Sequence, residues 1–147
     1  MKKVLFTLSL FVASFAFIAC GDDDDDTVIT VKELPENAQA FLQTHFPGQE
    51  VRLVEKDNDS YDVYLTNGYD VEFTLSGDWD DVDGNGKELP ESVIALLPEA
   101  IPAYVAANYS QNFIDEINKE SYGYEIGLNS NIELKFDING NFLRIDR

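Results

Sequence analysis

The stretch YDVYLTNGYDVEFTLSGDW, residues 61–79, decides the fold, because a second stretch with the same pattern, YEIGLNSNIELKFDINGNF, follows at residues 124–142. In both stretches apolar and polar residues alternate, which is the pattern of a strand with one buried face. Asn67-Gly68 is a strong signal for a two-residue hairpin turn, and Ser130-Asn131 takes its place in the second stretch. Each stretch therefore predicts antiparallel strands joined by tight turns.

The similarity extends outward from these two stretches. Residues 34–84 align without a gap with residues 97–147, at an offset of 63, and ten of the 51 aligned pairs are identical. Most of the identical and conservatively replaced pairs fall on apolar and turn positions, on which the core and the turns of a fold depend. We interpret this as a tandem duplication of one unit inside a single domain, 33–147, with repeats at 33–86 and 90–147.

Each unit begins with Leu-Pro-Glu, at residues 34–36 and 97–99, and continues with apolar residues at helical spacing. Four strands are predicted to follow, the first at Gln49–Lys56 in one unit and Asn112–Lys119 in the other. In the last strand of each unit two apolar residues stand three apart, which breaks the period of two and predicts a β-bulge. The predicted fold is α+β: two tandem α-β4 repeats whose helices pack on one face of an antiparallel sheet and leave the other face polar and open.

The N-terminus has the features of a lipoprotein signal. Lys2 and Lys3 precede an apolar run that ends at Cys20, and five aspartates, Asp22–Asp26, follow. The run is shorter than a typical membrane-spanning helix and has the length of the apolar region of a signal peptide. The alternative is an uncleaved anchor helix. Phe17-Ile18-Ala19-Cys20 resembles a bacterial lipobox, and an acidic tract after the cysteine resembles the surface-export signal of Bacteroidetes lipoproteins.

From these features we expect a signal peptide at 1–19, a lipid on Cys20 that anchors the protein to the outer membrane, and an acidic tether at 20–32. The domain would then be exposed at the cell surface. Asp26-Thr27-Val28 resembles a Bacteroidetes O-glycosylation site, which would place a glycan on Thr27.

The composition argues against several classes of function. The formal net charge of −18 argues against a nucleic-acid partner, because phosphate would be repelled. The single cysteine and single histidine, His45, allow no disulfide and no multi-histidine metal site, and no cofactor is expected. His45 stands near the end of the first predicted helix, where we expect it to cap that helix.

At this point the chain resembles a family. The Leu-Pro helix openings, the Pro47-Gly48 helix stop, the hairpin at 61–68 and the ending at 136–142 look like those of the PepSY-like lipoproteins of Bacteroidetes. Their fold is similar to the beta-lactamase inhibitor protein. The resemblance carries no catalytic residue and implies a non-enzymatic binding or inhibitor-like module with a protein or peptide partner.

The open sheet face is the predicted binding surface. Strand alternation places seven residues of the two units on it: Asp62, Tyr64, Asp70, Glu72, Glu125, Glu133 and Lys135. Tyr64 is the one large aromatic residue among them, as an interface anchor would be. The alternative is that this face is only solvated.

Two further functions stay open. Asp81-Val82-Asp83-Gly84-Asn85-Gly86 matches the first half of a calcium loop, with Asp81, Asp83 and Asn85 as ligands, but Ser92 stands where the bidentate Glu belongs. A low-affinity site that uses Asp78 and Asp80 as well is the looser form of this hypothesis. A carboxylate-based hydrolase is the other, although no pair of acids stands out.

Overall fold

The computed structural model describes residues 26–146, so the predicted signal peptide, Cys20 and residues 20–25 of the tether lie outside the described residues. The described chain forms nine strands: β1 Thr27–Ile29, β2 Val51–Lys56, β3 Ser60–Leu65, β4 Asp70–Thr74, β5 Trp79–Asp83, β6 Ile114–Glu120, β7 Gly123–Leu128, β8 Ile132–Asp137 and β9 Phe142–Asp146. It also forms the 3-10 helix η1 Val31–Glu33 and the α-helices α1 Glu36–His45, α2 Glu91–Ile94 and α3 Ala100–Asn108.

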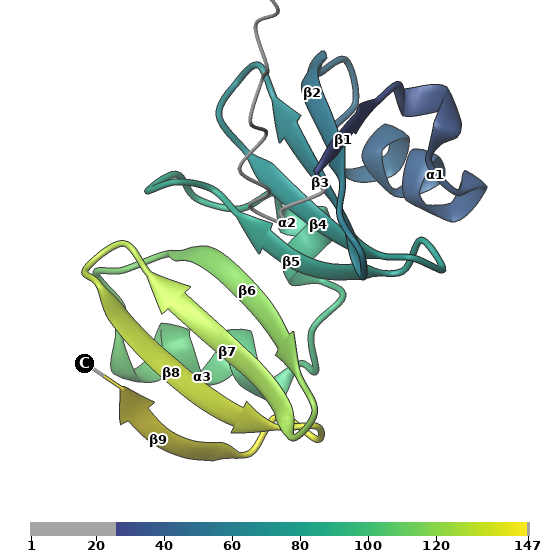
Figure 1. The fold of residues 1–147 in the computed structure, drawn as a ribbon. Coiled ribbons are helices and arrows are strands. Elements are labelled where there is room, and N and C mark those ends of the chain that lie inside the picture. The colour runs from purple at the N-terminus through teal and green to yellow at the C-terminus, as the bar shows by residue number, and fades with distance from the viewer. Residues whose placement is uncertain (1–25, 147) are drawn as a thin grey trace, which may run out of the picture.

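The strands form one open antiparallel sheet in the order of the chain, β1 to β9, with each strand hydrogen-bonded to the next (Figure 1). The α+β class and the antiparallel open sheet are therefore confirmed. We call the segment from α1 to β5 the first half and the segment from α3 to β9 the second half. The halves meet where β5 pairs with β6 through three residue pairs, at Asp81, Val82 and Asp83.

The ordered chain begins earlier than predicted. The tether was expected to run to Lys32, but Thr27–Ile29 pair with β2, and η1 follows directly. The reason is that Ile29 and Val31 are apolar and pack against the core. The aspartates that precede them led the sequence analysis to assign this whole segment to the acidic tether. Glu33 accepts hydrogen bonds of 2.8 Å from the Thr30 backbone N–H and hydroxyl and fixes the turn.

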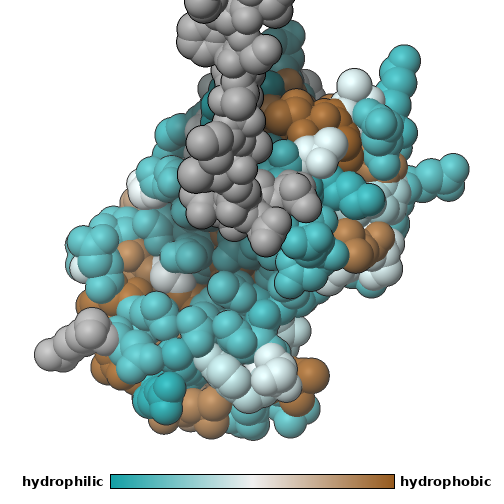
Figure 2. All heavy atoms as spheres, in the orientation of Figure 1, coloured by the Kyte–Doolittle hydropathy of each residue, from teal (hydrophilic) through white to brown (hydrophobic). Residues whose placement is uncertain are grey.

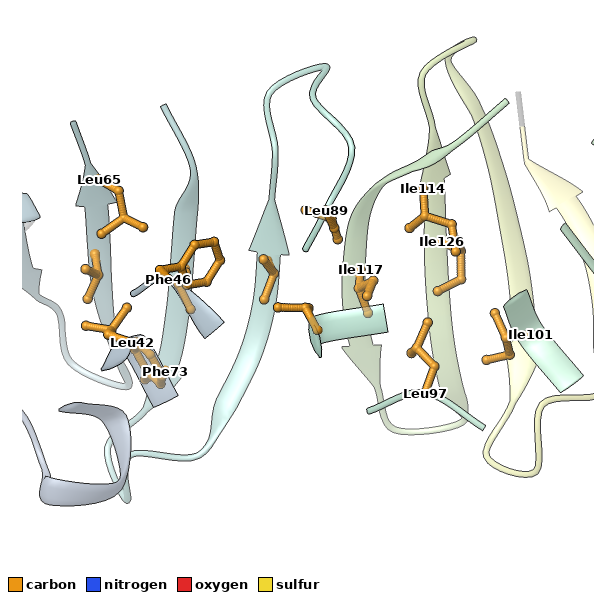
Figure 3. Packing of buried hydrophobic residues seen from close by; sticks show 14 of the residues in the cluster. Leu42, Phe46, Leu65, Phe73, Leu89, Leu97, Ile101, Ile114, Ile117 and Ile126 are labelled. Atoms are coloured by element: carbon orange, nitrogen blue, oxygen red, sulfur yellow. The ribbon is translucent and has the colours of Figure 1, made fainter. Parts of the chain in front are cut away.

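One hydrophobic core lies between the sheet and the helices (Figure 3). In the first half Leu42 of α1 belongs to this core together with Leu65 and Phe73 of the strands. In the second half Ile101 of α3 belongs to it together with Ile114 and Ile126. Leu89 and Leu97, from the segment that connects the halves, fill the space between these groups. The core is therefore continuous across the β5–β6 pairing.

Aromatic residues 63 positions apart make the same contacts in the two halves. Phe41 meets Phe73 edge-on, with ring centroids 5.5 Å apart, and Tyr104 meets Phe136 edge-on at 5.4 Å. Phe41 also stacks on Trp79, as Tyr104 stacks on Phe142. The register shifts before Phe73 and before Phe136 confirm the predicted bulges. The tandem duplication itself stays an interpretation of the sequence.

The face of the sheet away from the helices is the polar one. In the view of Figure 1 α3 lies behind the strands of the second half, and this side of the second half is mostly hydrophilic in the space-filling view (Figure 2). No helix within residues 26–146 is long and apolar enough to cross a membrane.

Candidate functional site

Cross-strand pairing brings acidic residues side by side on this polar face. One row of directly opposed residues crosses the sheet from β2 to β9: Glu55, Asp62, Glu72, Asp81, Asn118, Glu125, Lys135 and Arg144. A second row runs beside it from β3 to β9: Tyr64, Asp70, Asp83, Glu116, Gly127, Glu133 and Asp146. Strand alternation predicted this face, but only the register shows which residues are opposed.

Five of these acids form what we call the acidic patch: Asp62, Asp70, Glu72, Asp81 and Asp83. Together with Tyr64 they line a hollow of about 190 Å³ on β3, β4 and β5. The structure thus brings together all four binding residues predicted in the first half. It also adds Asp81 and Asp83, which the sequence had suggested only as metal ligands.

The acidic patch has no basic partner among residues 26–146. None of its five carboxylates has a Lys or Arg nitrogen within 4.0 Å in the described chain, where the ion pairs shown are those of Lys135 and Arg144. Partial burial, and then the neighbouring carboxylates, raise the pKa values of Asp62 and Glu72. The same two causes raise the pKa of Asp81 to about 8. These acids therefore resist ionisation in the folded protein.

Tyr64 stands at one end of the patch, opposite Asp70. Its side chain is half-buried, and burial followed by the charge of Asp62 raises its pKa. The Arg52 guanidinium carbon lies 5.4 Å from the Tyr64 ring centroid. Sequence reasoning missed Arg52, because it falls at the irregular register between Val51 and Leu53.

The predicted site residues of the second half form a closed ion-pair network instead. The Lys135 ammonium lies 2.5 Å from Glu125, 2.9 Å from Asp146 and 3.5 Å from Glu133. The Lys135 side chain is only 12% exposed. Its hydrogen bond to Glu125 lowers the pKa of that carboxyl and raises the pKa of the ammonium. The seven predicted residues therefore share one face but fall into two electrostatically different groups.

The predicted calcium loop has a different structure from a calcium-binding loop. Asp81 and Asp83 belong to strand β5, and Asn85 follows with a positive φ of 52°. The Asn85 backbone N–H donates to Asp83, and its side-chain amide donates to Asp70 and to the Gly68 carbonyl oxygen. Asn85 thus supplies donors to two carboxylates of the acidic patch. Within residues 26–146 no group of three or more His, Cys, Asp or Glu side chains has the geometry to hold a metal ion.

The other predicted residues lie elsewhere. Asp78 accepts hydrogen bonds from the Asn37 and Ser76 side chains at the turn before β5. His45 is the last residue of α1, although the helix was expected to end one residue later, and its ring contacts α2 instead of capping α1. Its Nδ1 shares a hydrogen bond of 2.9 Å with the Ser92 hydroxyl, so it connects α1 to α2. Thr27 is exposed and opens β1, opposite Lys56.

Comparison with known proteins shows which proteins this chain is similar to. A family model described as "Putative beta-lactamase-inhibitor-like, PepSY-like" matches residues 23–63 and 59–144. A crystal structure of a "putative calcium-regulated periplasmic protein" from Bacteroides thetaiotaomicron is 37% identical, with a TM-score of 0.77, and covers 84% of this chain and 98% of its own. A periplasmic protein from Bacteroides vulgatus is 38% identical, with a TM-score of 0.77, and covers 86% of this chain and 100% of its own. The comparison with curated proteins found no match.

Proposed function

We propose that this chain, which belongs to the PepSY-like, beta-lactamase-inhibitor-like family, is a non-enzymatic binding module of the bacterial envelope that holds a protein or peptide on its open sheet face. One observation carries the proposal: a hollow on that face is lined by five carboxylates that have no basic partner in the part of the chain that the structure describes. Like charges that stand directly opposite each other in a sheet are destabilising. A surface whose charges cost stability in this way is typical of a functional site.

The envelope location is part of the proposal. Similar proteins from Bacteroides are periplasmic, and the sequence ending at Cys20 has the features of a lipoprotein signal. In our proposal Cys20 carries the lipid anchor on the outer membrane, the aspartates after it form the tether, and the domain faces outward. Replacement Cys20→Ala should move the protein from the membrane fraction to the soluble fraction. Retention in the membrane with an intact N-terminus would show an uncleaved anchor helix instead.

The binding face can be tested with a photo-crosslinking amino acid at single positions. We expect partner adducts from positions 62 and 70 on the sheet face. The matched controls are positions 43 and 106, which are exposed on α1 and α3. Adducts of the same protein from all four positions, or from the helical positions alone, would contradict the proposal. Turnover of a glycan or peptide library by the purified protein would revive the hydrolase alternative.

Calcium binding is the second candidate function, because one relative is described as calcium-regulated. The carboxylates of the acidic patch would have to move closer together to form such a site, since no three of them have the geometry to hold a metal ion as they stand. A Kd of about 10⁻⁴–10⁻³ M, as in extracellular modules, would raise stability by only about 1 kcal/mol at millimolar calcium. The test compares the Tm in calcium and in magnesium at equal ionic strength. A shift specific to calcium that disappears in Asp81→Asn supports this candidate, and equal shifts exclude it.

We also propose that the two halves arose by duplication of one α-β4 unit. The aligned residues and the matching aromatic contacts support this origin. A full-length variant in which Phe41 and Tyr104 are exchanged for their counterparts, Phe41→Tyr and Tyr104→Phe, probes only packing. The decisive test is whether the isolated segments 33–86 and 90–147 associate into a folded complex, since a duplicated unit that evolved by fusion should retain that interface.

A further inference from the structure

We propose that the acidic patch receives a lysine or arginine side chain from the bound protein or peptide, in the position that Lys135 fills in the second half. This inference rests on the proposed function and specifies the partner: an extended segment that presents a basic side chain to β3, β4 and β5. Three observations carry it. The two halves share their cross-strand positions, two of these positions are basic in the second half and acidic in the first, and the acids of the first half line a hollow.

The two halves place their polar residues in the same register. Glu125 stands directly opposite Lys135, as Asp62 stands opposite Glu72. Glu133 stands opposite Asp146, as Asp70 stands opposite Asp83. The four residues of the first half each lie 63 positions before their counterparts in the second half: Asp62 and Glu125, Glu72 and Lys135, Asp70 and Glu133, Asp83 and Asp146. The three carboxylates that hold Lys135 therefore have counterparts in Asp62, Asp70 and Asp83.

What differs between the halves is the cation. Lys135 and Arg144 in the second half correspond to Glu72 and Asp81 in the first. Five positions that carry three acids and two bases in the second half carry five acids in the first, so their formal charge is −5 instead of −1. The second half shows that this arrangement of carboxylates holds an ammonium group at 2.5–3.5 Å. The first half keeps the carboxylates and lacks the ammonium.

The first half also has room for the missing group. The hollow of about 190 Å³ is many times larger than the space that a single water molecule needs. Its walls come from the helix-free face, and Tyr64 borders it with an aromatic ring that can cover an aliphatic stem. The basic side chain that borders this region, Arg52, lies against the Tyr64 ring and forms no ion pair with the patch. Charge complementarity therefore favours a basic side chain from outside.

The experiment uses the full-length protein in detergent and the capped peptide Gly-Ser-Lys-Ser-Gly as the probe. Binding is followed by the amide NMR shifts of β3–β5 at low ionic strength. Glu72→Lys supplies the chain with its own ammonium, and we expect it to weaken peptide binding at least tenfold and to raise the Tm. Glu88→Lys is the matched control, because it changes the net charge equally at an exposed position. It should weaken binding less than threefold.

A second variant tests the inference in case Glu72→Lys disturbs the fold. Asp62→Asn with Asp70→Asn removes two carboxylates, relieves repulsion and should also lose at least tenfold in affinity. The same peptide with norleucine in place of lysine should not bind. Equal binding by wild type, Glu72→Lys and the double Asn variant would overturn the inference. Amide shifts that respond to calcium chloride and not to the lysine peptide would overturn it in favour of a divalent cation. If crosslinks at positions 62 and 70 persist in either case, the proposed binding face stands while this inference fails.

Discussion

The Lys119 ammonium lies 3.6 Å from the centroid of the Trp79 ring and donates a hydrogen bond of 2.8 Å to the Trp79 carbonyl oxygen. Trp79 in turn stacks on Phe41 of α1. Because Lys119 belongs to β6 and Trp79 to β5, this contact joins the two halves on the helix side of the sheet. Partial burial lowers the pKa of Lys119, which marks an ammonium group drawn away from water.

We expect Lys119→Ala to lower the free energy of unfolding by about 1–3 kcal/mol, since it removes a partly desolvated cation–π contact and a hydrogen bond from a charged donor. Lys56 is the counterpart of Lys119 in the first half and lies 5.8 Å from the Tyr61 ring on an exposed position. Lys56→Ala should therefore cost less than about 0.5 kcal/mol. Urea unfolding of both variants measures their free energies of unfolding. Equal losses would show that the Lys119–Trp79 contact stabilises the protein no more than the exposed Lys56 contact does.

The acidic patch predicts an unusual dependence of stability on pH. The pKa of Asp81 is raised to about 8 in the folded protein by burial and by Glu116, Asp83 and Glu72, against an ordinary value near 4 when unfolded. Between these values the folded state binds more protons than the unfolded state, so stability is greatest near pH 4 and falls as the pH rises through about 8. Asp62, Glu72 and Glu116, whose pKa values are also raised, act in the same direction.

Other groups oppose this trend at the acidic end. The pKa values of Glu125, Asp137 and His45 are lowered, the first two by hydrogen bonds and the last by burial. Their contributions are lost as the pH falls through those values. We therefore expect the Tm to rise from pH 8.5 to pH 5.5 and to fall again in stronger acid. Asp81→Asn should flatten the first slope and stabilise the protein at pH 8.5 by about 1–2 kcal/mol. Asp59→Asn, on an exposed turn, should preserve the slope; if both variants keep it, Asp81 is not its source.

The fold was predictable from sequence where local pattern decides it. Alternation at 61–65 and the Asn67-Gly68 turn specify a hairpin on their own, and the spacing of Trp79 and Val82 specifies the bulge. The β1 strand was not predictable, because three residues that follow a run of aspartates carry little periodicity. It forms through tertiary contact, when Ile29 meets the core and β2 supplies backbone partners.

The site was predictable in the same partial way. Alternation placed Asp62, Glu72 and Lys135 on one face, but the pairing of strands distant in sequence decides which charges meet. Asp83 and Glu116 stand opposite each other across the β5–β6 pairing, although 33 residues separate them in the chain. Only the register reveals that Lys135 has three acidic neighbours while Glu72 stands among acids.

The β1 strand offers a matched pair of substitutions. Ile29 packs against the core, whereas its neighbour Val28 points to the opposite face and is 65% exposed. Ile29→Asn should lower the free energy of unfolding by about 1–3 kcal/mol, since it places a polar group against apolar side chains. Val28→Asn should change it by less than about 0.5 kcal/mol. Equal and small effects in thermal unfolding would return residues 27–29 to the tether.

The turn between β8 and β9 depends on a glycine that has no room for a side chain. Gly140 has a φ of 84°, and a Cβ there would lie 2.9 Å from the Pro98 Cβ and 3.2 Å from the Ala100 Cβ at the start of α3. Gly48 has a similar φ of 74° after α1, but a Cβ there would meet nothing within 4 Å.

Both alanine variants incur the left-handed backbone cost, about 1–2 kcal/mol, and only Gly140→Ala adds a clash. We expect Gly48→Ala to lower the free energy of unfolding by about 1 kcal/mol and Gly140→Ala by about 2–4 kcal/mol. Both variants carry the backbone strain, so the difference between their free energies of unfolding, measured in urea, gives the cost of the clash with α3 alone. Equal losses would mean that α3 moves aside at no cost and that the turn does not fix the position of the helix on the sheet.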